Sequence, residues 1–319
     1  MLYLSTRNKA DSFTAHRVLH SDGAPDSGQY MPMQLPVLTD VQLAQFEQMN
    51  FGEAVAEVMN LFFGTKITGW DVDFAVGRQA VSLTSIGHKV SVAESWHNPA
   101  GSHRDYVWML YRLVCENKDL ASRPNLWFET AVHIAILFGI YGKLCQQEIY
   151  AFDVAVQTGD LQQLLAIRYS QKMGLPVNNI ILGSLDGDGI WEFISHGDYQ
   201  CAGKPQISGL EALLWLEFGP HEAARYLDIQ EKRGIYHLQM LQLEQFRQGI
   251  FTAVVGNQRT ESVISSTMHT DRYVLDFPAA RAFGALQDYR SKTGIKRNTL
   301  LLSHDDPASA RYRYPFYCD

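Results

Sequence analysis

The segment Glu94–Val107, which reads ESWHNPAGSHRDYV, gathers the side chains best suited to chemistry. It contains two histidines, His97 and His103, followed directly by Arg104 and Asp105. Imidazole groups exchange protons near neutral pH, and a guanidinium binds carboxylate or phosphate oxygens in pairs. The segment therefore predicts a loop whose four polar side chains could bind an anionic ligand or act as acid–base groups.

A second candidate site is the sequence Gln157-Thr158-Gly159-Asp160, which we expect where a strand meets the N-terminus of a helix. Such a junction attracts anions, because free backbone N–H groups and the helix dipole both point at it. A plain capping turn, with Asp160 as the N-cap, is the favoured alternative. A phosphate cradle normally needs more than one glycine so that the backbone can approach the ligand. Thr158, Gly159 and Asp160 remain candidate ligand residues.

Several common activities are excluded by their missing motifs. The triplet His103-Arg104-Asp105 occurs in kinase catalytic loops, but the downstream asparagine and the glycine-rich nucleotide loop of kinases are absent. The sequence has no HExxH, GxSxG or Walker motif. The four cysteines are widely spaced and form no CxxC pair, so we predict neither a metal site nor a disulfide framework.

The overall composition is that of an ordinary globular protein. The chain has 319 residues, of which 46% are hydrophobic and 19% charged, and its net charge is −7. The negative balance argues against a general nucleic-acid or anionic-membrane surface. The N-terminal residues lack the apolar core of a secretory signal. The apolar run 126–144 is interrupted by Glu129, His133 and Lys143, so we interpret it as a buried core helix and expect a cytoplasmic protein.

Strand-like and helix-like patterns alternate along most of the chain. Helices are expected after the capping residues Thr39 and Asn50, with Gly64 ending the second of them. These belong to a small, mostly helical N-terminal domain of residues 1–85, whose first 38 residues are loop-rich. Residues 86–319 alternate strand, helix and strand, which predicts an α/β domain with a parallel sheet, and residues 208–250 look helical.

The C-terminal stretches YVLDFPAARAFGAL (273–286) and LLLSHDDPA (300–308) weakly match the closing helix and strand of the threonine synthase family, and four earlier stretches resemble that family more closely. They are YLSTRN at 3–8, APDSGQYMP at 24–32, FGEAVAEVMNLFFG at 51–64 and TGDLQQLLAIRYSQKMGLP at 158–176. The segment Glu94–Asp105 is similar to the family's E-L-F-H-G-P-T-L-A-F-K-D. The resemblance implies a fold-type II enzyme fold similar to the tryptophan synthase β chain. It also implies pyridoxal phosphate as cofactor and phosphohomoserine as substrate.

The same resemblance exposes departures at the family's catalytic positions. Arg104 stands where the family has the lysine that forms the Schiff base, and a guanidinium stays protonated and cannot form one. The family's glycine-rich phosphate loop reads Gly159-Asp160-Leu161-Gln162-Gln163, without its second glycine. The partner of the pyridine nitrogen aligns with Ser303 or His304. The family's S-G-D-T-G loop and a longer segment are missing between Glu116 and Asn125, which implies a truncated domain.

These departures leave two hypotheses. In the first, the chain is a non-catalytic homologue without pyridoxal phosphate that acts by binding a small anionic metabolite or a protein, either another copy of itself or a related chain. Trp96, Tyr106, Trp108 and Trp127 lie near the missing segment and mark either an interface or ordinary core. In the second, the chain remains an enzyme, either a carbon–oxygen lyase of the threonine synthase type anchored by another lysine, or one with altered chemistry that does not use the cofactor.

Overall fold

The computed structural model describes residues 1–8, 10–159, 161–202 and 209–308. The helices are α1 (Ala15–Leu19), α2 (Asp40–Gln48), α3 (Phe51–Phe63), α4 (Gly69–Val76), α5 (Arg104–Val114), α6 (Leu126–Cys145), α7 (Leu161–Met173), α8 (Gly189–His196), α9 (Leu210–Phe218), α10 (Pro220–Glu231), α11 (Met240–Arg247), α12 (Asn257–Asp271) and α13 (Phe277–Thr293). The strands are β1 (Leu2–Ser5), β2 (Ser12–Thr14), β3 (Tyr30–Pro32), β4 (Ser82–Ile86), β5 (Val90–Glu94), β6 (Phe152–Gln157), β7 (Val177–Ser184), β8 (Asp198–Gln200), β9 (Ile235–His237), β10 (Ile250–Val254) and β11 (Thr299–Ser303).

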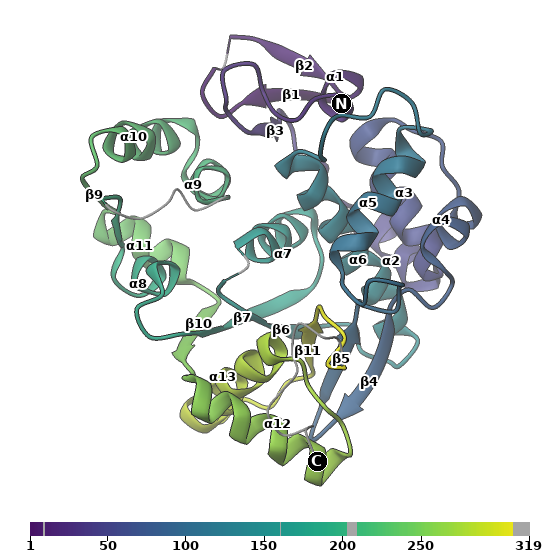
Figure 1. Cartoon of the computed structure of the whole chain (residues 1–319), viewed down its shortest axis with the longest axis vertical. Helices are drawn as coiled ribbons and strands as arrows, with labels where there is room; N and C mark the ends of the chain where they lie inside the picture. The colour runs from purple at the N-terminus through teal and green to yellow at the C-terminus, as the bar shows by residue number, and fades with distance from the viewer. Residues whose placement is uncertain (9, 160, 203–208, 309–319) are drawn as a thin grey trace.

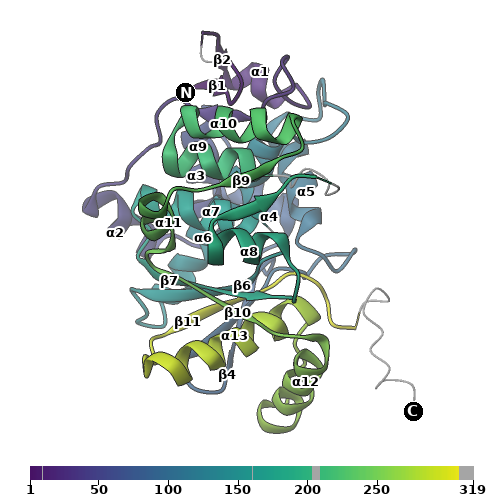
Figure 2. The ribbon, with the colours of Figure 1, turned by 90° about the vertical axis from the view of Figure 1, so that its left-hand side faces the viewer.

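A six-stranded sheet with the order β10-β7-β6-β11-β5-β4 forms the centre of the molecule (Figure 1). All neighbouring strands in it are parallel except the edge pair β4 and β5, which is antiparallel. Helices α6 and α7 lie on one side of the sheet, and α12 and α13 lie on the other (Figures 1 and 2). The predicted α/β class is confirmed, with a mixed, mostly parallel sheet.

The alternation of side chains along the strands divides the interior into two cores. Val154 and Val156 of β6 belong to the core shared with α6 and α7, whereas Ala155 between them belongs to the core shared with α12 and α13. This is the period of two that a strand buried on both faces must show. The larger core also contains residues from both sides of position 85, and the domain boundary there stays a prediction.

The predicted helix ends near the N-terminus are confirmed by their side-chain contacts. Thr39 and Asn50 each form a capping box with the residue three positions later. Gly64 ends α3 in the left-handed conformation, with φ of 66°. Helix α6 is the only helix of the described residues that is long and apolar enough to span a membrane, but 89% of its apolar window is buried inside the protein. It is the core helix that the sequence predicts.

Two regions differ from the sequence expectation. Residues 1–38, expected to be loop-rich, contain the antiparallel sheet β2-β1-β3. The region 208–250 is helical as expected but also contains β9, and the unexpected edge strand β10 begins at Ile250. These strands are short and depend on pairing with distant partners, which a local pattern does not reveal.

The packing of α13 on β7 is unusually close at Gly183. A Cβ atom at this position would lie 2.6 Å from the backbone oxygen of Arg281 and 2.9 Å from the backbone nitrogen of Ala282. The contact is with helix backbone rather than with a side chain that could move aside. Glycine therefore sets the distance between the sheet and α13.

The C-terminal end of β11 is fixed to the start of α13 by one carboxylate. Asp276 is completely buried, and its Oδ1 accepts a hydrogen bond from the N–H of Ala279 at 2.6 Å. Its Oδ2 accepts from the Ser303 hydroxyl and from the N–H groups of His304 and Asp305, at 2.9, 2.8 and 3.1 Å. Burial raises the pKa of Asp276 to about 6, although these four donors act to lower it.

We expect Gly183→Ala to lower the free energy of unfolding by about 1–3 kcal/mol, because the new methyl group must displace the backbone of α13. Urea denaturation of the full chain measures the change. Gly23→Ala is the matched control, since the nearest atom to its Cβ is 3.9 Å away, and we expect a change within about 0.5 kcal/mol. A Gly183 variant as stable as the wild type would contradict the close contact.

We expect Asp276 to give the stability of the protein a specific pH dependence. Because the folded-state pKa lies above the ordinary value of 3.8, the folded state holds this proton more tightly, and the resulting stability is lost as the pH rises through about 6. The free energy of unfolding of the wild type, minus that of Asp276→Asn, should therefore fall by about 2–3 kcal/mol between about pH 4 and about pH 7. Urea denaturation of both proteins across this range measures it, and a difference independent of pH would contradict the raised pKa.

Candidate functional site

A cavity of about 490 Å³ lies at the carboxyl ends of the parallel strands. Its lining includes Gln157, the last residue of β6, and the residues that directly follow β6 and β11, Thr158 and His304. In open α/β sheets, ligands bind in the crevice beyond the carboxyl ends of the strands. The volume is within the range of small-molecule sites.

Four of the described helices begin at the wall of this cavity. The lining includes the first residues of α5 and α7, Arg104 and Leu161, and the second residues of α8 and α13, Ile190 and Pro278. Each helix N-terminus carries a partial positive charge and backbone N–H groups without a partner inside the helix. Asp188 and Asp276 cap α8 and α13 with their side chains, whereas His103 makes no such cap for α5. The arrangement favours a negatively charged ligand.

The Arg104 guanidinium adds a full positive charge to the cavity wall. Among the residues that the structure describes, it makes no hydrogen bond and no ion pair, and the side chain is exposed. A guanidinium binds carboxylate and phosphate groups through two parallel N–H bonds. Arg104 is therefore placed to contact an anion in the cavity.

Three histidines from distant parts of the chain lie together beside Arg104. The rings of His103 and His304 are 4.3 Å apart, and those of His103 and His133 are 5.6 Å apart, measured between centroids. His133 comes from α6, and His304 follows β11. All three are at least 90% buried. We call them the histidine cluster.

The histidine cluster favours neutral imidazoles. Burial, followed by the neighbouring His103 and Arg104, lowers the pKa of His133 to about 3. Burial also holds the pKa of His304 well below its ordinary value, with His103, His133 and Arg104 acting in the same direction. At neutral pH these two rings are hydrogen-bonding groups rather than cations.

Polar contacts fix the remaining walls of the cavity. The Thr158 hydroxyl donates a hydrogen bond to Asp188, and the N–H of Thr158 donates to the backbone oxygen of Gly183 at 3.0 Å. The Gln162 amide donates to Glu129 Oε2 at 2.6 Å, which ties α7 to α6. The walls are thus built from side chains that already have fixed partners.

The structure brings four of the predicted ligand residues together at this cavity, namely His103, Arg104, Thr158 and Gly159. Asp105 is half-buried in the first turn of α5 and is not part of the described lining. Asp160, also predicted, lies outside the described residues. These residues remain predictions as ligand contacts.

His97 lies in a different place from the other candidates. Its Nε2 is 2.8 Å from both Glu94 Oε2 and the Ser82 hydroxyl, so it connects β5 to β4. It borders a separate depression of about 830 Å³ with Lys143, Gln146 and Gln147. Burial acts to raise the pKa of Glu94, but hydrogen bonds from Ser82, Tyr273, His97 and Thr84 outweigh it and lower the pKa. This position suits a structural role for His97.

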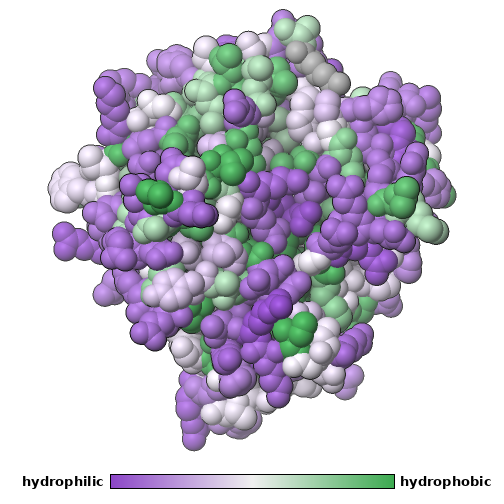
Figure 3. Space-filling view, turned by 180° about the vertical axis from the view of Figure 1, so that it is seen from behind, coloured by the Kyte–Doolittle hydropathy of each residue, from purple (hydrophilic) through white to green (hydrophobic). Residues whose placement is uncertain are grey.

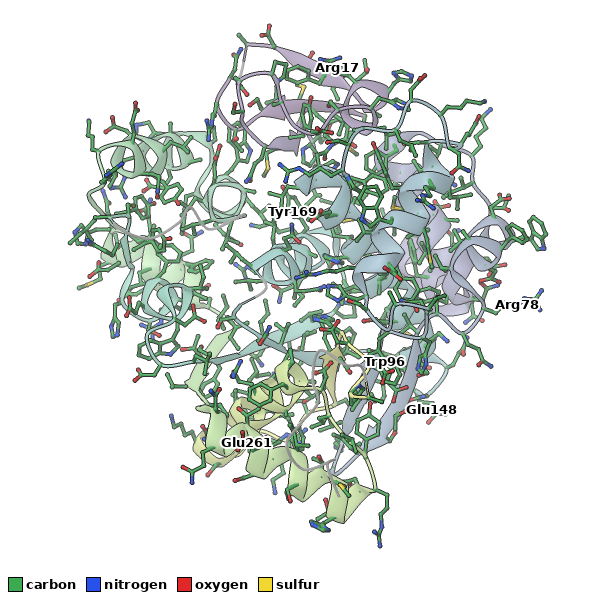
Figure 4. The ribbon with its side chains drawn as sticks, viewed as in Figure 1. Arg17, Arg78, Trp96, Glu148, Tyr169 and Glu261 are labelled. Atoms are coloured by element: carbon green, nitrogen blue, oxygen red, sulfur yellow. The ribbon has the colours of Figure 1, made fainter. Side chains whose placement is uncertain are left out.

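The aromatic residues near the short connection between α5 and α6 divide into two groups. Tyr106 and Trp127 are 1% and 2% exposed and belong to the core. Trp108 is 40% exposed and lines the cavity. Trp96 is half-buried, and its ring N–H donates to the Ser303 hydroxyl at 2.9 Å; Figure 4 shows it close to β5. Tyr106 and Trp127 are therefore ordinary core residues, and an interface that involves Trp96 or Trp108 stays a prediction.

The residues of the cavity do not fit pyridoxal phosphate. The cofactor needs a lysine amine, and no lysine is among the described residues that line the cavity. The Ser303 hydroxyl, aligned with the partner of the pyridine nitrogen, is fully buried and donates to Asp276 while accepting from Trp96. A Cβ atom at Gly159 would meet only Gln157, at 3.6 Å, so the glycine does not form a tight backbone cradle. His304, the other residue aligned with that partner, lines the cavity, so what the described lining lacks is the lysine anchor.

Sequence reasoning did not select His133 as a site residue. The residue type itself was the available signal in the sequence. A histidine within a strongly apolar helix is costly to bury, so its presence there requires a reason. His304 was singled out only by its position in the resemblance. Both approach Arg104 through packing between elements far apart in sequence.

Two comparisons of the sequence, with protein families and with individual proteins, each find a match. The family described as threonine synthase N terminus matches residues 2–78. A stretch of 114 residues is 31% identical to the threonine synthase-like 2 proteins of Homo sapiens and Pongo abelii. It covers 33% of this chain and only 24% of those proteins, so about three quarters of these relatives lies outside the match.

The solved structures with a similar fold are threonine synthases. The yeast enzyme has a TM-score of 0.83 at 14% identity, over 96% of this chain and 87% of that one. The enzyme of Brucella melitensis, solved with bound PLP, has a TM-score of 0.76 at 17% identity, over 97% and 89% of the two chains. At these identities the structures show the fold alone, and the sequence matches supply the relationship. This chain is thus similar in sequence to threonine-synthase-like proteins over part of its length, and in fold to threonine synthases over nearly all of it.

Proposed function

We propose that the protein binds a small anionic metabolite in the cavity between α5, α6 and α7, without pyridoxal phosphate. The observation that carries the proposal is the combination of four helix N-termini and Arg104 around one cavity with no lysine in its described lining. The positive ends of helices and a guanidinium attract the anionic groups of a ligand. The loss of the lysine removes the covalent anchor while these attractive groups remain.

The parent reaction, threonine synthesis from phosphohomoserine, is disfavoured by the same observations. Lys143, the lysine on α6, borders the separate depression beside His97 rather than the cavity. Lys172 on α7 lies 3.5 Å from Glu217, with which it forms an ion pair. An enzyme with chemistry independent of the cofactor would have to use the histidine cluster, whose neutral rings can accept protons. That cluster is the observation that keeps altered chemistry as the second candidate.

Binding to a protein remains a weaker proposal. The exposed side chains of Trp70 and Phe74 stack on α4 with ring centroids 5.5 Å apart, and such pairs occur in interfaces. On the face seen in Figure 3, however, hydrophilic residues cover most of the surface and the apolar residues form smaller groups. Self-association and a cytoplasmic location stay predictions that light scattering and cell fractionation can test.

We expect pyridoxal phosphate to form no covalent adduct in the native cavity. After incubation with the cofactor and reduction with borohydride, peptide mass spectrometry should find no attachment in the folded protein above the background of the denatured one. Arg104→Lys should gain an adduct at residue 104, because it places a primary amine at that position. Stoichiometric attachment to a lysine of the folded wild type would overturn this part of the proposal.

We expect Arg104→Gln to weaken the binding of sulfate by about tenfold or more, since a hydrogen bond to a charged group is worth about 1.5–3 kcal/mol. Isothermal titration calorimetry of the full chain measures the dissociation constant. Arg78→Gln is the matched control, because the Arg78 side chain is 81% exposed and points into solvent (Figure 4). Equal loss in both variants would show that only overall charge matters and that Arg104 is not part of a site.

A further inference from the structure

The imidazole of His133 has no structural partner to explain its burial. It is 4% exposed, and neither ring nitrogen has a hydrogen-bond partner among the described residues. A buried polar group without a partner lowers the stability of a fold. Such a group in a cavity wall is the kind of feature that a ligand satisfies.

His133 lies between two spaces in the molecule. The residue lines both the main cavity and an adjoining void of about 20 Å³. The void has room for about one water molecule, which can serve one ring nitrogen. The second nitrogen still lacks a hydrogen-bond partner among the described residues, and the main cavity borders the same residue.

The charged and titratable groups around His133 come from three sides. From α5 and the residue before it come Arg104 and His103, and from the chain after β11 come His304 and Asp305. On α6 itself, Glu129 accepts a hydrogen bond from the amide of Gln162 on α7. The other residues that α7 contributes, Leu161 and Gln163, are uncharged, and Asp160 lies outside the described residues. His103 and Arg104 are the groups that lower the pKa of His133 electrostatically.

On this basis, which rests on the proposed function, we propose that His133 contacts the ligand and that the ligand presents an oxyanion to the histidine cluster. When the ligand binds, the cluster takes up one proton. The oxyanion accepts a hydrogen bond from a ring N–H and pairs with Arg104. Its negative charge offsets the burial and the nearby Arg104 guanidinium, which keep the His133 and His304 rings neutral. A proton from solvent adds to a ring nitrogen of the cluster. No covalent bond to the ligand forms or breaks.

The direction of the pH dependence follows from the state of the free protein. Burial holds the pKa of His133 at about 3 without ligand, so the ring is neutral at ordinary pH. A bound anion raises the pKa of the cluster, and protons are taken up at any pH between the free and the bound values. Affinity for the anion therefore rises as the pH falls, by at most about tenfold per pH unit for one proton.

Sulfate is the probe for this test, because its own charge stays constant from about pH 5 to about pH 8, where histidines titrate. Calorimetry of the full chain at constant ionic strength, in buffers with different ionisation enthalpies, gives both the dissociation constant and the number of protons taken up. For the wild type we expect close to one proton per sulfate and tighter binding at low pH. His133→Leu should bind sulfate about tenfold more weakly near pH 6 and take up less than half as many protons.

His221→Asn is the matched control, because His221 is exposed on α10, away from the cavity. It should keep the proton uptake and the affinity of the wild type. His133→Leu should also show a higher midpoint of urea unfolding than the wild type, since it replaces an unpartnered polar ring by an apolar side chain. A residue with a purely structural role would show a lower midpoint, and that result would overturn the inference.

The remaining outcomes separate this inference from the proposed function. Sulfate binding that depends on Arg104 but takes up no proton overturns the inference and leaves the proposed function standing. No binding of sulfate to the wild type at any pH overturns both. Tight binding of Zn²⁺ that His133→Leu abolishes identifies the cluster as a metal site and overturns the anion inference; no group of metal-ligating geometry is found among the described residues.

Discussion

The buried carboxylate of Asp276 is the constraint on which the candidate site depends. It receives hydrogen bonds from the start of α13 and from the chain just beyond β11, so it holds two cavity-lining segments in one place. His304 is one of its donors through the backbone, and this contact sets the position of the imidazole in the histidine cluster. A full charge without solvent is costly, and the four donors reduce that cost. The position of these cavity-lining segments therefore depends on a buried carboxylate whose charged form is disfavoured by its burial.

The parallel topology places positive helix ends at the cavity, whichever side chains line it. In a parallel sheet, each strand that ends at one edge leads into a helix that begins there. The helix N-termini at the cavity are therefore a property of the fold and persist when individual side chains change. Arg104, at the position where the resemblance expects a lysine, supplies a positive charge and two parallel donors but no nucleophilic amine. The fold supplies attraction, and the side chain determines whether covalent chemistry follows.

The sequence predicts those structural features that depend only on residues close together in the chain. Thr39, Asn50 and Gly64 could be read as helix ends because a cap acts on backbone groups within one turn. Strand β10 was missed, although the run Ile250–Val254 is rich in β-branched and aromatic residues, because a helical pattern precedes it without a break. His103 and Thr158 could be proposed separately from their local motifs. Their joining with His133 and His304 depends on the order of strands and on packing, which no local motif encodes.

The position of His133 shows how one helix serves both stability and the site. Helix α6 is almost entirely buried, and its apolar side chains contribute to the larger core on both sides of His133. Burial of that apolar surface stabilises the helix strongly enough to hold one unpartnered imidazole in the interior. A loop could not do so, because it lacks the surrounding packing. The rigid core helix therefore presents a neutral imidazole, in a fixed position, to a cavity whose other groups attract negative charge.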